Sequence, residues 1–220
     1  HLLRAIGLLF EVEQGKATQE HPIAFELLNS GEINRNVIYL AVLLHDIAKG
    51  RPEDHSTAGA RIARRLGPRL GFTKAETRLT EWLVREHLVM SDVAQRRDLS
   101  DPRTIEDFAA TVQTTERLKH LLVLTEVDIK AVGPGVWNGW KAKLISELYF
   151  ETQALLIGAG GIINRGERLA AAQAAFSHAL PQDWTQRRLS AYLRLHSEAY
   201  WLNFPTDVQV HHAKLIEKSK

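Results

Sequence analysis

Apolar residues recur at intervals of three and four along most of the chain, the spacing of helices that bury one face. No two segments of alternating apolar and polar residues are joined by a tight Asn-Gly or Asp-Gly turn, so a β-hairpin is not indicated. The pattern predicts an all-α fold. Its clearest element is a deeply buried helix over residues 36–49, ended by Gly50 and Arg51-Pro52. The apolar positions of this helix are Val37, Ile38, Leu40, Ala41, Leu44, Ile47 and Ala48.

The rest of the chain carries further helix signals. A Ser or Thr residue introduces each of the predicted helices over residues 56–66 and 74–87. Asp101-Pro102 combines an N-cap with a proline in the first turn of a further helix. The glycine-rich stretch 158–161 is the best candidate for a domain boundary, and we expect a frayed polar tail over 205–220. We expect the further helices over residues 56–66, 74–87, from 101 onward, and over 116–132, 138–157, 167–179 and 183–202.

Composition narrows the classes of function. With 220 residues and 45% hydrophobic content, the chain is expected to form one domain over residues 1–157 and a helical extension over 158–220. Polar residues interrupt every apolar run well before the roughly 18 to 20 residues of a membrane span, so we expect no membrane segment. The net charge is only +2 and basic residues form no dense tract, so nucleic-acid binding is not indicated. Because the chain begins at His1 and not at Met, we expect it to be part of a longer protein.

A candidate metal site is centred on His45, Asp46 and Asp128. His45 and Asp46 lie at the end of the buried helix, although many helices carry this dipeptide without a ligand role. Asp128 follows Leu124 by four residues on the apolar stripe of 116–132, so its carboxylate points inward. A buried carboxylate is costly unless it is paired or binds a cation, and a buried salt bridge is the alternative. Because the chain has no Cys, nitrogen and oxygen atoms must hold any such cation.

Three basic residues are candidates for binding a phosphate. Lys49 lies four residues after His45 and three after Asp46, so on a helix it projects from the same side. A cation is also favourable at a helix C-terminus for purely structural reasons. Arg96 and Arg97 are able to clamp phosphate oxygens bidentately, and a solvated pair in a loop beside acidic residues is the alternative.

With His1 added, the order His, His-Asp, Asp resembles the HD phosphohydrolase superfamily in both residue identity and spacing. The resemblance implies an HD-domain helical bundle in which a divalent metal ion is ligated by His1, His45, Asp46 and Asp128. It also implies additional ligands at His55 and His87, where two-metal members carry histidines. A loose terminal residue is the alternative for His1, and a surface or capping role is the alternative for His55 and His87. Mn²⁺ is the expected ion, with Mg²⁺ or Fe²⁺ as alternatives, in one or two copies.

Further segments resemble the central domain of a narrower family, the bacterial bifunctional PII uridylyltransferase/uridylyl-removing enzymes. Among them, Trp137-Asn138-Gly139-Trp140-Lys141 has no evident use in an HD hydrolase in general. This narrower resemblance spans roughly residues 1–152, and the helices beyond 161 resemble that family's connector toward its regulatory domains. The segments that carry it are residues 43–50, 54–56, 87–91, 94–98, 124–129 and 137–141.

The narrower resemblance implies a metal-dependent phosphodiesterase that removes UMP from the uridylylated PII signal protein during nitrogen regulation. It implies a cytoplasmic enzyme in which Asp46 and Lys49 take part in catalysis. The family's nucleotidyltransferase and glutamine-sensing ACT domains are not found in this chain. Two alternatives remain open, an HD hydrolase of a free nucleotide or alarmone and a non-catalytic module that senses a metal or a nucleotide.

Overall fold

The computed structural model describes residues 1–180, 184–196, 200–201, 204 and 206–218. Every regular element within these ranges is a helix, which confirms the all-α fold class. No helix in the described ranges is both long enough and apolar enough to cross a membrane. The α-helices are α1 (Leu2–Glu13), α2 (Pro22–Asn29), α3 (Arg35–Leu44), α4 (His55–Leu66), α5 (Lys74–Glu86), α6 (Val89–Arg96), α7 (Pro102–Val112), α8 (Thr115–Val132), α9 (Gly139–Ala179), α10 (Gln186–Leu193) and α12 (Thr206–Lys218).

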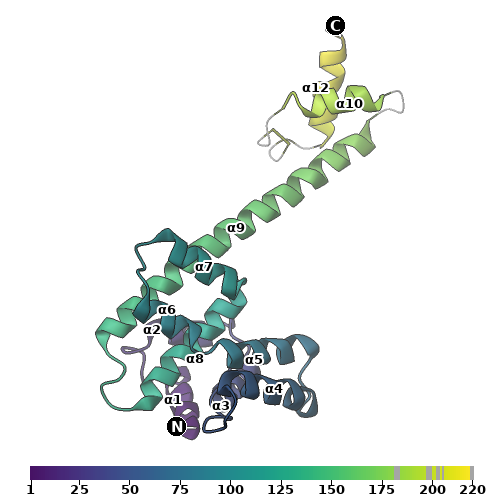
Figure 1. Cartoon of the computed structure of the whole chain (residues 1–220). Helices are drawn as coiled ribbons and strands as arrows, with labels where there is room; N and C mark the ends of the chain where they lie inside the picture. Colours follow the sequence, from purple (N-terminus) through teal and green to yellow (C-terminus); the bar gives the residue numbers. More distant parts are fainter. Residues whose placement is uncertain (181–183, 197–199, 202–203, 205, 219–220) are drawn as a thin grey trace. The chain divides into compact units, whose positions relative to one another are not determined.

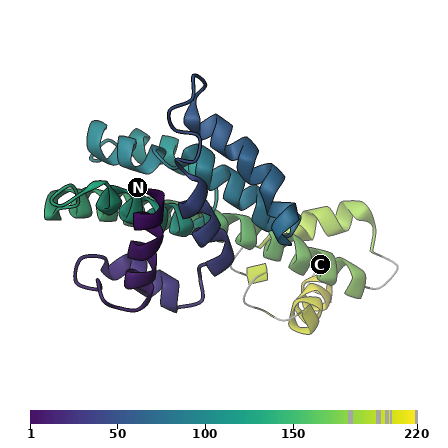
Figure 2. The same cartoon turned by 90° about the horizontal axis from the view of Figure 1, so that it is seen from below.

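Residues 1–157 form one compact unit around α8 (Figure 1). Helix α8 is buried on nearly all sides between Leu118 and Val127, and helices α1, α2, α3, α5, α6 and α7 all pack against it. Helices α4 and α5 lie side by side, joined by the short 3₁₀ helix η1 (Gly67–Leu70), as Figures 1 and 2 both show. Several different helix ends can therefore approach the end of α8.

Side-chain caps define where the helices of this unit begin. The predicted cap Asp101 is confirmed, since its Oδ1 accepts a hydrogen bond from the Arg103 N–H at 3.0 Å. Thr73 caps α5 in a reciprocal pair with Glu76, as the Ser/Thr rule predicts. Helix α4 is capped by Asp54 and not by a Ser, because Asp54 accepts from the Thr57 N–H at 2.8 Å. Helices α1, α2 and α6 were not among the predicted elements.

The predicted helix over 36–49 is wrong at its C-terminal end. Helix α3 ends at Leu44, and His45 is its C-cap. Residues 45–50 continue as turns, with hydrogen bonds from the Ile47 N–H to the Leu44 carbonyl at 3.1 Å and from the Lys49 N–H to the Asp46 carbonyl at 3.0 Å. These tighter bonds turn His45 and Asp46 away from a regular helical course.

The predicted helix end at residues 158–161 is also wrong. Helix α9 runs without interruption from Gly139 to Ala179, so the segments predicted over 138–157 and 167–179 belong to one helix. Each glycine costs about 1 kcal/mol relative to alanine in a helix interior, but no proline is present to remove a backbone donor. Glycine alone therefore does not end this helix.

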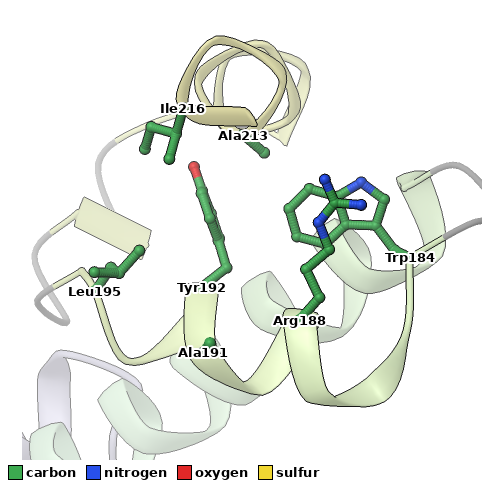
Figure 3. Close-up of a pocket in the computed structure, with 7 residues that line it drawn as sticks. All are labelled: Trp184, Arg188, Ala191, Tyr192, Leu195, Ala213 and Ile216. Atoms are coloured by element: carbon green, nitrogen blue, oxygen red, sulfur yellow. The ribbon is translucent and has the colours of Figure 1, made fainter. Parts of the chain in front are cut away.

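Residues 158–220 form a second compact unit. Its described core contains Phe176, Tyr192, Trp201 and Ala213. A cavity of about 130 Å³ lies beside Tyr192 and Trp184. The Arg188 guanidinium lies 4.8 Å from the centre of the Trp184 ring, and both side chains line this cavity (Figure 3).

Two predicted elements of the second unit need correction. The predicted helix over 183–202 is shorter where it is described, as α10, and residues 183, 197–199 and 202 lie outside the described ranges. The tail expected to be frayed forms α12, because Val210, Ala213 and Ile216 recur at a three-residue spacing and pack on the aromatic core. The division between Ile157 and Gly158 falls inside α9, and the functional assignment of the two parts stays a prediction.

Candidate metal centre

Ligand-type side chains gather where two helices end and two others begin. His45 and His87 are the C-caps of α3 and α5, whereas His1 is the N-cap of α1 and His55 is the first residue of α4. Asp128 joins them from the C-terminal part of α8. Helix C-termini carry partial negative charge, so the ends of α3 and α5 favour a cation at this place.

His1, His45 and Asp128 form what we call the first group, whose ligand atoms all lie within 4.8 Å of one another. Asp128 Oδ1 lies 2.8 Å from His1 Nε2 and 3.3 Å from His45 Nε2. The two Nε2 atoms are 3.2 Å apart. Three ligand atoms thus converge on one point, and two imidazoles with one carboxylate are a set that suits a divalent cation.

Asp46, His55 and His87 form the second group, whose ligand atoms also lie within 4.8 Å of one another. Asp46 Oδ1 lies 3.5 Å from His55 Nε2 and 3.8 Å from His87 Nε2. Its other oxygen, Oδ2, lies 3.9 Å from the Nε2 atoms of both His1 and His45. Asp46 therefore presents one carboxylate oxygen to each group.

The two buried histidines are oriented as metal ligands. The Nδ1 atoms of His45 and His87 each lie 2.8 Å from the backbone carbonyl three residues earlier, those of Val42 and Val84. A carbonyl only accepts, so each Nδ1 carries a hydrogen, and in the neutral form of each ring the lone pair lies on Nε2. This tautomer directs the free Nε2 toward the carboxylates, and the donor set fits a divalent cation.

The electrostatic environment differs between these two histidines. Burial opposes the protonation of His45, but the hydrogen bond to Asp128 and its negative charge outweigh burial and raise the pKa of His45 above its usual value. Burial lowers the pKa of His87, and the positive charge of His45 lowers it further. A metal ligand must be a neutral imidazole. A cation in the first group would therefore take the place of the proton that Asp128 otherwise favours on His45.

A cavity of about 440 Å³ opens over both groups, and it brings Lys49 to them. Lys49 Nζ donates to Asp46 Oδ2 at 2.8 Å, although the Lys49 side chain is 70% exposed. The hydrogen bond to Asp46 raises the pKa of Lys49 above its usual value. The cavity therefore contains an ammonium group next to the shared carboxylate. Its lining residues are His1, Asp46, Lys49, His55, His87, Leu88, Asp128 and Val132.

The structure does not bring the two predicted arginines to this cavity. Arg96 Nη2 lies 3.6 Å from Asp92 Oδ1 one turn earlier on α6, and Arg97 Nη2 lies 3.7 Å from Asp107 Oδ2 on α7. Both arginine side chains are exposed. Their predicted role in phosphate binding stays a prediction that this geometry does not support.

Two apolar residues of the cavity were missed by the sequence reasoning. Leu88 and Val132 are 40% and 62% exposed, and both line the cavity. Leu88 follows His87 directly, and Val132 lies one helical turn after Asp128. That spacing was the available signal, because residues four apart share one face of a helix.

A buried hydrogen-bonded pair of side chains was also missed. His21 Nδ1 lies 2.8 Å from Glu126 Oε2, and both side chains are almost fully buried. The His21 ring stacks on Trp137 with centroids 4.9 Å apart, and Trp137 Nε1 donates to the Glu20 carbonyl at 3.2 Å. This contact fastens α8 and the loop after it to α2, which gives Trp137 of the 137–141 segment a structural role.

Comparison with known proteins identifies the family of this chain. The HD domain family model matches residues 1–124. Bifunctional uridylyltransferase/uridylyl-removing enzymes from Nitrobacter winogradskyi, Bradyrhizobium sp. (strain ORS 278) and Rhodopseudomonas palustris are each 52% identical to the chain over its whole length. The chain spans 24% of the length of each of these relatives.

The helical bundle and its His-Asp site define a metal-dependent hydrolase of the HD type, and the chain belongs to the HD domain family. More narrowly, the whole chain is similar to one segment of the bifunctional uridylyltransferase/uridylyl-removing enzymes. The family implies a divalent metal ion, which agrees with the two groups of His and Asp ligands.

Proposed function

We propose that this chain is a phosphodiesterase that removes UMP from a tyrosine of a uridylylated PII signal protein. The observation that carries the proposal is the pair of ligand groups that share Asp46 within one cavity. The name of the relatives, which includes a uridylyl-removing activity, supports the choice of substrate. We assign residues 1–157 to the hydrolase domain and 158–220 to a helical connector. We further propose that the enzyme acts in the cytoplasm.

The proposed metal ligands are the six side chains of the two groups, and Mn²⁺ is the proposed ion. A divalent ion held there supplies Lewis acidity toward phosphate and activates water at neutral pH. Asp46 holds both groups in one arrangement, and the exposed Lys49 ammonium is able to turn from Asp46 to a phosphate oxygen of the substrate. The tyrosine phenol has an intrinsic pKa of about 10, so it leaves without a strong general acid.

The direct test is the release of UMP from uridylylated PII by the chain after chelation and after addition of Mn²⁺. We expect release with Mn²⁺ and none in chelator. The matched control pair is Asp46→Asn and Asp92→Asn, because Asp92 is an exposed carboxylate outside the cavity. Release should be lost only in the first variant.

Two outcomes would contradict the proposal. If a folded, Mn²⁺-loaded chain released no UMP from uridylylated PII, then uridylylated PII would be excluded as the substrate. If the same preparation hydrolysed a free nucleotide such as an alarmone, the site would be catalytic but its substrate would be a small molecule. Metal binding without any hydrolysis would instead favour a sensing module.

A further inference from the structure

The helices that supply the buried ligands are joined to one another at their far ends. Helices α3 and α5 both end at the site, with His45 and His87 as their C-caps and ring centroids 5.3 Å apart. Asn34 caps the start of α3, and Glu76 lies in the first turn of α5. Because their starts and their ends are both in contact, α3 and α5 run parallel and side by side.

Asn34 is the centre of this distant contact. Its Nδ2 donates to Glu76 Oε1 at 2.9 Å, and its Oδ1 accepts from the Val37 N–H at 3.2 Å. Its backbone N–H donates to His120 Nε2 on α8 at 3.0 Å. One residue thus links the starts of α3 and α5 to the N-terminal part of α8.

The two partners of Asn34 are themselves fixed. Glu76 Oε2 accepts from the Thr73 N–H at 2.8 Å, so this carboxylate both caps α5 and binds Asn34. His120 is fully buried, and its Nδ1 donates to the Glu116 carbonyl at 2.8 Å. Burial lowers the pKa of His120, so the ring stays neutral and its Nε2 accepts from Asn34. Neither partner is free to follow a displaced Asn34.

The spacing between this contact and the ligands is matched on the two parallel helices. His45 follows Asn34 by eleven residues, and His87 follows Glu76 by eleven residues, each a rise of about 16 Å. Asp128 follows His120 by eight residues on α8, a rise of about 12 Å. A helix transmits an axial shift of its start to its end, so a slip of α3 against α5 or α8 moves the ligand atoms apart.

We propose that Asn34, Glu76 and His120 are positioning residues that set the axial register of α3, α5 and α8 and thereby the distances between the metal ligands. The proposal rests on the ligand assignment made under the proposed function. It predicts that these residues control metal affinity although each lies about two to three helical turns from the ligand on its own helix.

The test is calorimetric titration of Mn²⁺ into the chelator-treated chain and into two variants. The variants first remove the donor of the Asn34–Glu76 hydrogen bond and then restore a donor on the other side of it. Asp at position 34 still caps α3, but it faces the Glu76 carboxylate with no donor between them. We expect Asn34→Asp to weaken Mn²⁺ binding about tenfold, the lower end of the loss caused by replacing a residue that contacts a metal ligand directly, because Asn34 acts only through the helices. Adding Glu76→Gln supplies an amide donor to the new carboxylate and still permits the cap at Thr73. The double variant should recover an affinity within about threefold of the original chain.

Asp101→Ala is the matched control, because it removes an N-cap from α7, a helix that carries none of the six ligands. It should lower the midpoint of thermal unfolding of the metal-free chain and leave Mn²⁺ affinity unchanged. The inference is overturned if Asn34→Asp binds Mn²⁺ as the original chain does, or if Glu76→Gln fails to rescue it. Equal loss of affinity in Asp101→Ala would overturn it as well, by showing that general destabilisation suffices. If the original chain binds no Mn²⁺, the proposed metal centre itself fails.

Discussion

The first and second ligand groups are built from the same parts. Each combines a buried His at a helix C-cap, a His at a helix start whose side chain is 26% exposed, and one carboxylate. In each, the buried His directs its Nδ1 to the carbonyl three residues earlier. Both groups therefore have the same local arrangement, in which the C-terminus of one helix lies next to the N-terminus of another.

The groups differ in how their carboxylates are used. Asp128 approaches the first group alone, with Oδ1 2.8 Å from His1 Nε2 and 3.3 Å from His45 Nε2. Asp46 belongs to the second group through Oδ1 but also turns Oδ2 toward the first. The end of α3 therefore provides a ligand to each group from adjacent residues. The two groups contain the same kinds of ligand, but Asp46 faces both of them. Substitutions can therefore distinguish Asp46 from the ligands that belong to one group only.

The largest effect should come from Asp46→Ala. Removal of the shared carboxylate should leave neither group able to hold its ion, and the rate of UMP release should fall at least about a thousandfold, the equivalent of several kcal/mol of Lewis-acid stabilisation. Elemental analysis after dialysis should find no bound Mn²⁺, and circular dichroism should find the helices intact. Retention of one tightly bound ion by this variant would break the coupling between the groups.

Asp128→Asn and His87→Gln should each have a smaller and more local effect. Each removes a ligand from one group only, so we expect one Mn²⁺ to be retained and the rate to fall on the order of a hundredfold. Counting bound Mn²⁺ per chain in both variants measures this directly. The comparison would be wrong if either variant lost both ions, because the groups would then form a single indivisible site.

Part of this arrangement could be predicted from the sequence. His45 and Asp46 were found because a buried apolar helix precedes them, and Asp128 because it continues an apolar stripe. His1, His55 and His87 came from family resemblance, since a single histidine at a helix end carries no such pattern. The all-α class followed from periodicity, which depends only on local spacing and is confirmed.

The division into two groups and the support at their far ends could not be predicted. Which oxygen of Asp46 faces which histidine depends on how the ends of separate helices meet. The bond between Asn34 and His120 spans 86 positions of the chain and has no local signal. The wrong prediction of a helix end at residues 158–161 has a different cause. The glycines there were given more weight than the helix-forming residues around them.

Lys49→Ala should have a moderate effect that leaves both groups loaded. We expect the rate to fall on the order of tenfold, less than for a buried donor, because the Lys49 side chain is 70% exposed and solvent screens its charge. Lys49→Arg should keep most of the rate. If both variants bind two Mn²⁺ per chain, Lys49 acts on the substrate and is not needed to hold Asp46. Loss of an ion in Lys49→Ala would instead mean that Lys49 acts through the shared carboxylate.

The smallest effect should be on the pH dependence of stability, and it concerns the support behind both groups. Burial lowers the pKa of His120 below the usual value of about 6.5 for histidine, so the unfolded chain takes up this proton at a higher pH than the folded chain does. His120 therefore makes folding less favourable as pH falls below 6.5 toward its lowered pKa. In His120→Gln, whose side-chain oxygen can still accept from the Asn34 N–H, this loss should disappear. Thermal unfolding of both metal-free chains between about pH 7.5 and 5.5 measures the difference. Equal losses on acidification would mean that His120 is not held neutral, and the register of α3 against α8 would then need another explanation.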